Sequence, residues 1–167
     1  MKDNLPTSAK VVVIGGGIAG CSVAYHLTEF GWDDIVLLER DQLTSGTTWH
    51  AAGLLGQVGA SATITKLRNY SLNLYKKLQE ETGIETGLKQ NGSLTVATDT
   101  DRLEELKRQA TFAQRFNIQV DEINIDKITE LYPLINTKDI VGGIYIPKDG
   151  QANPIGITNV LAKAAKN

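Results

Sequence analysis

The chain has 167 residues, of which 41% are hydrophobic and 22% are charged, a composition typical of a soluble domain with a packed core. Lys and Arg number 17 against 19 Asp and Glu, so the formal net charge is −2. A general nucleic-acid binder, which needs a basic surface, is excluded. The single Cys21 excludes an intramolecular disulfide framework and a thiolate metal site, and the two histidines, His26 and His50, are too few for a histidine-rich metal centre.

No targeting or membrane segment is predicted. The start of the chain, MKDNLPTSAK, is polar and has neither the apolar stretch of a signal peptide nor the arginine-rich pattern of a transit peptide. Two long uncharged runs, 11–28 and 42–65, are interrupted by glycine or are rich in serine and threonine, unlike a membrane span. We therefore expect a cytoplasmic protein without a membrane span.

The first part of the chain predicts a strand–helix–strand unit. Residues 11–14 form a β-branched run typical of a strand buried on both faces. Residues 18–30 have helical apolar spacing and end at Gly31, and 35–38 form a second short apolar run. Two parallel strands joined by a helix form the right-handed βαβ unit of an α/β fold.

Helices and strands continue through the rest of the chain. The predicted elements, in chain order, are a helix over 64–78 ending near Gly83, a strand around 94–96 after the turn Asn91-Gly92, a helix over 101–116, a short helix ending at Tyr132, a strand over 140–147 and a helix that begins at Asn153 and Pro154. We therefore expect two parts, a βαβ unit with the following loop in 1–60 and a helix-and-strand excursion in 61–167. We expect these residues not to complete the sheet, because only two of the predicted strands fit a doubly wound sheet.

Gly15, Gly17 and Gly20 form the pattern G-x-G-x-x-G between the first predicted strand and helix. Glu39 follows 19 residues later (39 − 20), at the end of the second strand. This order and spacing is the dinucleotide-binding fingerprint, in which the glycines permit the tight turn, the approach of a pyrophosphate and close helix–strand packing. Free N–H groups at the helix start would bind the phosphates. Glu39 would bind a ribose hydroxyl and repel the 2′-phosphate of NADP, but the fingerprint does not distinguish FAD from NAD.

The segments beyond the fingerprint resemble the dimethylglycine dehydrogenase and sarcosine dehydrogenase family of FAD-dependent amine oxidoreductases. The resemblance extends over nearly the whole chain and is carried by LLERDQLTSGTTWHAAGLL, LYKKLQEETG, NGSLTVAT, ELYPLIN and IPKDGQANP. It implies the amino-terminal part of a Rossmann-like FAD-binding fold, with 1–60 as the FAD-binding unit and its flavin loop. Residues 61–167 would then be an α+β excursion of the substrate region, and the FAD domain would be completed by a carboxy-terminal part of the same polypeptide.

The resemblance also assigns cofactor-binding residues. In this family the histidine of the WHAAG segment is joined covalently to the flavin, and that position is His50 here. The fingerprint and the resemblance together predict FAD contacts from Gly15, Gly17, Ile18, Ala19, Gly20, Glu39, Arg40, Thr47, Thr48, His50, Gly53 and Leu54. They identify no catalytic residue and no metal ligand.

The implied reaction is oxidative N-demethylation of a small N-methyl amino acid such as sarcosine or dimethylglycine. A hydride would pass from the N-methyl carbon to the flavin, and the iminium would be hydrolysed or give its carbon to tetrahydrofolate in a carboxy-terminal region. Electrons would leave to an acceptor such as an electron-transfer flavoprotein. Eukaryotic relatives would reside in the mitochondrial matrix, and the isolated 167 residues are expected to be inactive.

Two other functions remain open at this point. The regulatory subunit of pyruvate dehydrogenase phosphatase resembles the same family but is a regulatory binding protein, and the presence of Trp49-His50 in this chain favours the enzyme. An NAD-linked dehydrogenase would use the glycine fingerprint without needing the second loop. Bound flavin in the purified protein, visible by its absorbance, would separate these alternatives.

Overall fold

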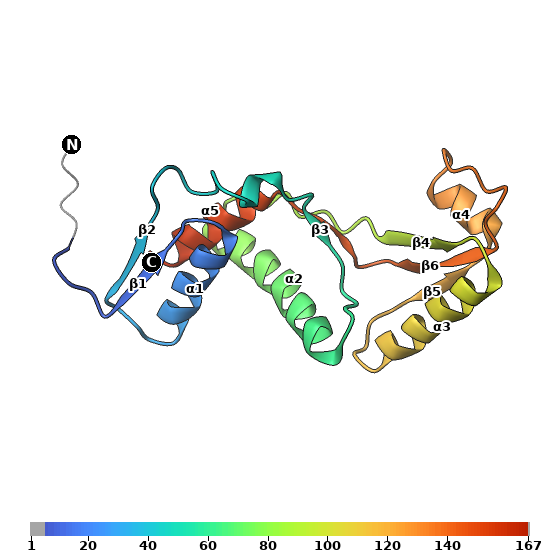
Figure 1. Cartoon of the computed structure of the whole chain (residues 1–167), viewed down its shortest axis with the longest axis horizontal. Helices are drawn as coiled ribbons and strands as arrows, with labels where there is room; N and C mark the ends of the chain where they lie inside the picture. The colour runs from blue at the N-terminus through green and yellow to red at the C-terminus, as the bar shows by residue number, and fades with distance from the viewer. Residues whose placement is uncertain (1–5, 167) are drawn as a thin grey trace. The chain divides into compact units, whose positions relative to one another are not determined.

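The computed structural model describes residues 6–166. Its elements are β1 (Val11–Ile14), α1 (Ile18–Glu29), β2 (Ile35–Leu38), the 3-10 turn η1 (Thr48–His50), β3 (Leu54–Leu55), α2 (Ala62–Thr82), β4 (Ser93–Ala97), α3 (Thr100–Gln114), β5 (Asp121–Ile123), α4 (Ile125–Leu131), β6 (Gly142–Ile146), β7 (Gly150–Gln151) and α5 (Pro154–Ala164) (Figure 1). Among the described residues, no helix is both long and apolar enough to cross a membrane.

The chain forms two compact units that interleave along the sequence. Within the described residues, unit 1 comprises 6–53, 74–88 and 152–166, and unit 2 comprises 54–73 and 89–151. The single boundary predicted at residue 60 therefore differs from the division in the structure. The difference arises because α5 packs on α1, which buries an apolar face of each helix (Figure 1). Two segments that are far apart in the sequence are thereby joined in one unit, and no local sequence pattern predicts such a pairing.

Unit 1 contains the predicted βαβ unit. Strands β1 and β2 pair in parallel, with Val11 opposite Ile35 and Ile14 opposite Leu38. Helix α1 ends where predicted, just before Gly31, whose φ of +82° is favourable for glycine.

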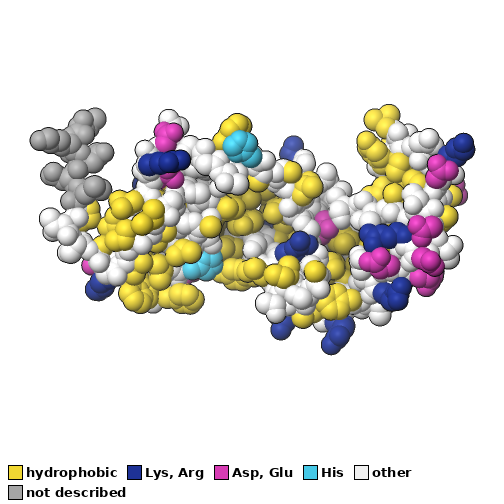
Figure 2. Space-filling model, viewed as in Figure 1, with side chains coloured by type: hydrophobic (Ala, Val, Ile, Leu, Met, Phe, Trp, Pro, Cys, Tyr) yellow, Lys and Arg dark blue, Asp and Glu magenta, His cyan; other side chains and the backbone are white. Residues whose placement is uncertain are grey.

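The expectation that β1 is buried on both faces is wrong for the described chain. Val12 and Ile14 are 50% and 86% exposed, since α1 covers only one face of this two-stranded sheet. Figure 2 shows apolar side chains gathered at the surface of the part of the molecule that holds β1, β2 and α1.

Unit 2 is built on a three-stranded antiparallel sheet in the order β4–β6–β5. Helix α3 covers one face of this sheet, where Leu106 packs in a buried cluster with Ala97 and Ile144. Strand β6 lies close to β4 at Gly143, where only glycine fits: a Cβ at this position would lie 2.5 Å from the Thr95 carbonyl oxygen. Strands β3 and β7 form a separate antiparallel pair.

Candidate dinucleotide-binding site

The glycine turn between β1 and α1 has the geometry that the fingerprint predicts. Gly15 has a φ of +111°, a conformation that side-chain-bearing residues rarely adopt, and its N–H donates to the Leu38 carbonyl at 2.8 Å. A Cβ on Gly20 would lie 1.9 Å from the Gly15 carbonyl oxygen. Gly15 therefore makes the tight turn, and Gly20 allows the helix to pack against it.

The start of α1 is bonded to the loop that contains the predicted flavin-binding residues. Gly17 is the N-cap residue and has no side chain to cap the helix. The Ile18 N–H instead donates to the Thr48 hydroxyl oxygen at 3.0 Å. The N–H groups of Ala19 and Gly20 also belong to the first turn and have no acceptor within the helix, so they can receive an anion such as a pyrophosphate.

Glu39 follows β2 directly and folds onto the glycine turn. Its carboxylate accepts the Gly16 N–H at 2.6 Å and the Asp41 N–H at 3.2 Å. These two hydrogen bonds, that from Gly16 most strongly, hold the pKa of Glu39 below its usual value. A carboxylate has about four acceptor positions, so Glu39 keeps capacity for ribose hydroxyls and is ionised at neutral pH.

An open hollow of about 380 Å³ lies beside the glycine turn in unit 1. It brings together three of the predicted cofactor residues, Gly15, Glu39 and Arg40, and its other lining residues are Ile14, Leu38, Asp41, Ser45 and Gly46. Binding pockets for small molecules have volumes of about 300–1,000 Å³. The turn without side chains, the free helix N–H groups, the ionised acid and the hollow together fit the ribose and pyrophosphate of a dinucleotide.

The loop after β2 presents Trp49 and His50 to solvent in the turn η1. The two rings lie 3.9 Å apart between centroids, with 35° between their planes, and the Trp49 ring N–H donates to the Ser45 carbonyl at 3.1 Å. His50 Nδ1 lies 3.2 Å from the Gly46 carbonyl oxygen. For this contact to be a hydrogen bond Nδ1 must carry the proton, which leaves Nε2 of the neutral ring as the nucleophilic nitrogen.

The other predicted residues of this loop have different surroundings. Thr48 is buried, whereas Thr47 is exposed. Gly53 has a φ of +72°, and its carbonyl accepts the Ala152 N–H at 2.9 Å, which joins the end of the loop to the start of α5. Leu54 belongs to unit 2, where it pairs with Gln151. Its contact with FAD, like those of the other predicted residues, stays a prediction.

Sequence reasoning missed a buried carboxylate in unit 2. Asp149 is 3% exposed, and it accepts hydrogen bonds from the Gln57 N–H and from the Ser93 hydroxyl, both at 2.7 Å. Its own carbonyl accepts the Gly92 N–H at 2.8 Å. In the sequence Asp149 is simply an acid that precedes Gly150, a pair that predicts an ordinary exposed turn.

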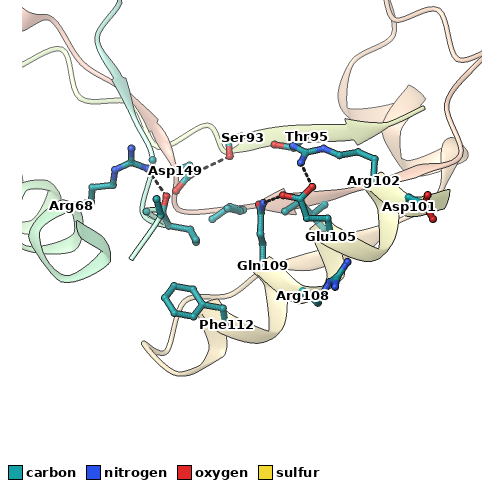
Figure 3. Close-up of a pocket in the computed structure, with 16 residues that line it drawn as sticks. Arg68, Ser93, Thr95, Asp101, Arg102, Glu105, Arg108, Gln109, Phe112 and Asp149 are labelled. Atoms are coloured by element: carbon teal, nitrogen blue, oxygen red, sulfur yellow. Dashed lines mark hydrogen bonds and ion pairs between the residues drawn. The ribbon is translucent and has the colours of Figure 1, made fainter. Parts of the chain in front are cut away.

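Asp149 lies at one end of a larger hollow within unit 2, with a volume of about 1190 Å³. Figure 3 shows Asp149 directed at Ser93, with Arg68 nearby on α2. Along α3, Glu105 pairs with Arg102 at 2.7 Å and accepts a hydrogen bond from Gln109 at 3.3 Å (Figure 3). These three polar side chains of α3 thus bond to one another, whereas Asp149 connects three separate segments of the chain.

Comparison with known proteins identifies the family of the chain. A family model described as FAD dependent oxidoreductase (DAO) matches residues 10–167. Mitochondrial sarcosine dehydrogenase of Homo sapiens is 43% identical over 162 residues, mitochondrial dimethylglycine dehydrogenase of Rattus norvegicus is 42% identical over 158 residues, and the mitochondrial pyruvate dehydrogenase phosphatase regulatory subunit of Mus musculus is 44% identical over 161 residues.

These matches cover 95–96% of this chain but 18% of each relative, so the chain spans less than a fifth of their length. Among solved structures, L-proline dehydrogenase from P. horikoshii is similar with a TM-score of 0.89 and 28% identity, over 97% of this chain and 42% of that chain. The fold is therefore part of a larger FAD-binding domain. The chain belongs to the DAO family of FAD-dependent oxidoreductases.

Proposed function

We propose that the protein is an FAD-dependent amine dehydrogenase that oxidatively removes an N-methyl group from a small amino acid such as sarcosine or dimethylglycine. The identity of 42–43% to the dehydrogenases of these two substrates supports the substrate class. The observation that carries the proposal is the exposed Trp49–His50 turn, which Thr48 ties to the start of α1. A protein that used only NAD would have no need of such a turn.

The residues of unit 1 would bind the cofactor in a defined order along its length. The N–H groups of Ala19 and Gly20 would bind the pyrophosphate, Glu39 would accept the ribose hydroxyls, and Arg40 would lie beside the adenosine. His50 would hold the flavin covalently through a ring nitrogen. Bound FAD supplies the hydride acceptor for oxidation of the N-methyl carbon.

The remaining parts of the reaction are proposed from the relatives. Because the chain matches 18% of their length, we propose that the groups that contact the substrate, and any site for tetrahydrofolate, lie in polypeptide beyond residue 167. An electron-transfer flavoprotein is the kind of acceptor that would reoxidise the cofactor. The relatives are named as mitochondrial, and the cytoplasmic expectation for this chain stays a prediction.

The test is the fate of the flavin when the purified full-length protein is precipitated with acid. The yellow colour should stay with the polypeptide in the wild type and should be released from the His50→Ala variant. His26→Ala is the matched control, because His26 lies in α1, outside the flavin loop, and its Nδ1 is 2.7 Å from the Ser22 carbonyl oxygen. The flavin of this variant should stay bound to the polypeptide. Colour that washes out of the wild type, or that remains in His50→Ala, would show that His50 is not the link.

A regulatory binding protein is the second candidate, because the phosphatase regulatory subunit is 44% identical, as similar as the dehydrogenases. Sequence identity therefore does not choose between the two. Turnover of sarcosine or dimethylglycine with an artificial electron acceptor does choose, when it is measured on protein with a known flavin content. Stoichiometric flavin without turnover of either amine would favour the regulatory function.

A further inference from the structure

Thr48 takes the place of a helix N-cap from a distant position in the sequence. Helix N-caps are usually Ser, Thr, Asp or Asn, whose side-chain oxygen accepts an N–H of the first turn. In α1 the N-cap position is Gly17, and the Thr48 hydroxyl accepts the Ile18 N–H although the two residues are 30 apart. Thr48 is only 8% exposed, and its hydrogen bond with the Ile18 N–H is partly buried.

The contact depends on a glycine at position 17. A Cβ on Gly17 would lie 2.9 Å from Thr48 Oγ1, closer than such atoms approach without a shift. The second glycine of the fingerprint therefore leaves room for the Thr48 hydroxyl as well as for a phosphate. The Thr48 hydroxyl thus lies at the turn of α1 where the pyrophosphate is proposed to bind.

The backbone around Thr48 is held on both sides. On one side the Thr44 N–H donates to the Gly16 carbonyl at 3.0 Å, and on the other the Gly53 carbonyl accepts the Ala152 N–H at 2.9 Å. Between these points, Thr48 provides the side-chain bond to the glycine turn. Thr48 also begins η1, and its carbonyl accepts the Ala51 N–H at 3.1 Å, which closes the turn that carries His50.

We infer that Thr48 is a positioning residue for His50: its hydroxyl fixes the η1 turn to the start of α1 and so sets the place of the His50 ring relative to the pyrophosphate site. This inference rests on the proposed attachment of the flavin at His50. It also changes the role expected for Thr48, from a residue that contacts the cofactor to one that acts through His50. Thr48 itself need not touch the flavin.

Attachment is the step that such positioning would accelerate. Forming the bond between a His50 ring nitrogen and the 8α-methyl carbon breaks one C–H bond of that methyl and one ring N–H bond. The two protons go to solvent, and the two electrons go to dioxygen or another two-electron acceptor. Such a step is fast only when the two partners are held in the reacting geometry. Loosening η1 would slow this step while leaving the phosphate-binding N–H groups in place.

The experiment follows the attachment reaction in the full-length protein. Protein produced without flavin is mixed with FAD, and the fraction of flavin that stays with acid-precipitated polypeptide is measured over time, alongside the total flavin bound before precipitation. Thr48→Val removes the acceptor but keeps the shape, and we expect attachment to slow about tenfold, the effect of one lost hydrogen bond, with total binding unchanged. Thr48→Ser, which keeps the hydroxyl, should restore the wild-type rate.

Two control variants separate positioning from a general loss of stability. Thr111→Val removes an exposed hydroxyl of α3, outside the flavin loop, that donates to the Lys107 carbonyl at 3.1 Å. Thr28→Val removes a hydroxyl that donates to the Tyr25 carbonyl at 2.7 Å at the other end of α1. Both should attach flavin at the wild-type rate, and Thr48→Ala, a second way to remove the hydroxyl, should be as slow as Thr48→Val.

The outcomes distinguish the inference from the proposed function. A wild type that attaches no flavin would contradict the proposed attachment at His50. A wild type that attaches flavin, with Thr48→Val and Thr48→Ala attaching it equally fast, would overturn the role of Thr48. The role would also be overturned by a Thr28→Val variant that is as slow as Thr48→Val, because the effect would then reflect the stability of α1.

Discussion

The Glu39 carboxylate and the Gly16 N–H are joined by a hydrogen bond of 2.6 Å that links the end of β2 to the glycine turn. A second bond, from the Asp41 N–H at 3.2 Å, holds the carboxylate on its other oxygen. Since both bonds are within the chain, the acid of the fingerprint is oriented before any ribose binds. The cost of ordering this side chain is therefore not added to the cost of binding the cofactor.

These two hydrogen bonds make the free energy of unfolding depend on pH, and the sign of this dependence follows from the pKa of Glu39. The bonds from Gly16 and Asp41 lower this pKa below the ordinary value of 4.5, so the ionised carboxylate stabilises the folded state above that pH. The stabilisation is lost as the pH falls from 4.5 through the lower pKa of the folded state. In Glu39→Gln this titration is absent. Urea unfolding of the FAD-free protein at a series of pH values should therefore show a wild-type advantage that shrinks below 4.5. A pH-independent difference would contradict this account.

Glu39 should also contribute to the affinity for FAD, by accepting hydrogen bonds from the ribose. Affinity can be measured only when binding is reversible, so Glu39 and Glu39→Ala are compared in a His50→Ala background, in which no covalent link forms. There, Glu39→Ala removes a charge-assisted hydrogen bond and should weaken FAD binding at least about tenfold in a fluorescence titration. Unchanged affinity would show that the carboxylate serves only the glycine turn.

Gly20→Ala should destabilise unit 1. The new methyl group would lie 1.9 Å from the Gly15 carbonyl oxygen, and a backbone atom cannot move aside without shifting α1 away from the turn. The expected loss of unfolding free energy is about 1–3 kcal/mol, measured by urea unfolding. Gly46→Ala is the matched control, because a Cβ there meets nothing within 4 Å, and its stability should stay within about 0.5 kcal/mol of the wild type.

The parts of the fold that sequence predicted are those fixed by short-range patterns. The apolar run Val11–Ile14, the glycine spacing and the cap at Asn153, whose side chain accepts the Ile155 N–H at 3.0 Å, each act over a few residues. Strand β5 begins with Asp121 and Glu122, which disfavour a strand, and it forms because β6 pairs with it. The two-residue strands β3 and β7 likewise depend on pairing, β3 with β7 and Gln151 of β7 also with Lys89.

The residues of the site also fall into two groups, those that a local sequence pattern predicts and those that only the structure brings together. Gly15, Gly20 and Glu39 could be predicted, since the fingerprint is a local pattern whose spacing follows from one βαβ unit. The bond from Ile18 to Thr48 spans 30 residues, and that from Gln57 to Asp149 spans 92. A side chain that bonds to a distant backbone N–H leaves no periodicity in the sequence, so these two contacts required the structure.

Asp149 should contribute substantially to the stability of unit 2. Asp149→Ala would leave the buried Gln57 N–H and the Ser93 hydroxyl without their acceptor, at a cost of about 3–6 kcal/mol, since hydrogen bonds to charged groups contribute about 1.5–3 kcal/mol each. Asp149→Asn keeps one acceptor oxygen and should cost less, roughly 1–2 kcal/mol. Urea unfolding measures both losses, and hydrogen exchange should become faster at the Gln57 amide.

A double-mutant cycle with Ser93→Ala tests whether the loss comes from the shared bond. Because Ser93 Oγ lies 2.7 Å from Asp149 Oδ2, the loss of unfolding free energy in the double variant should be smaller than the sum of the two single losses by about 0.5–3 kcal/mol. Asp139→Asn is the control, since Asp139 is exposed, and its effect should stay within about 0.5 kcal/mol. Additive costs at Asp149 and Ser93, or a loss in Asp139→Asn equal to that in Asp149→Asn, would mean that the Asp149 carboxylate does not hold these segments together.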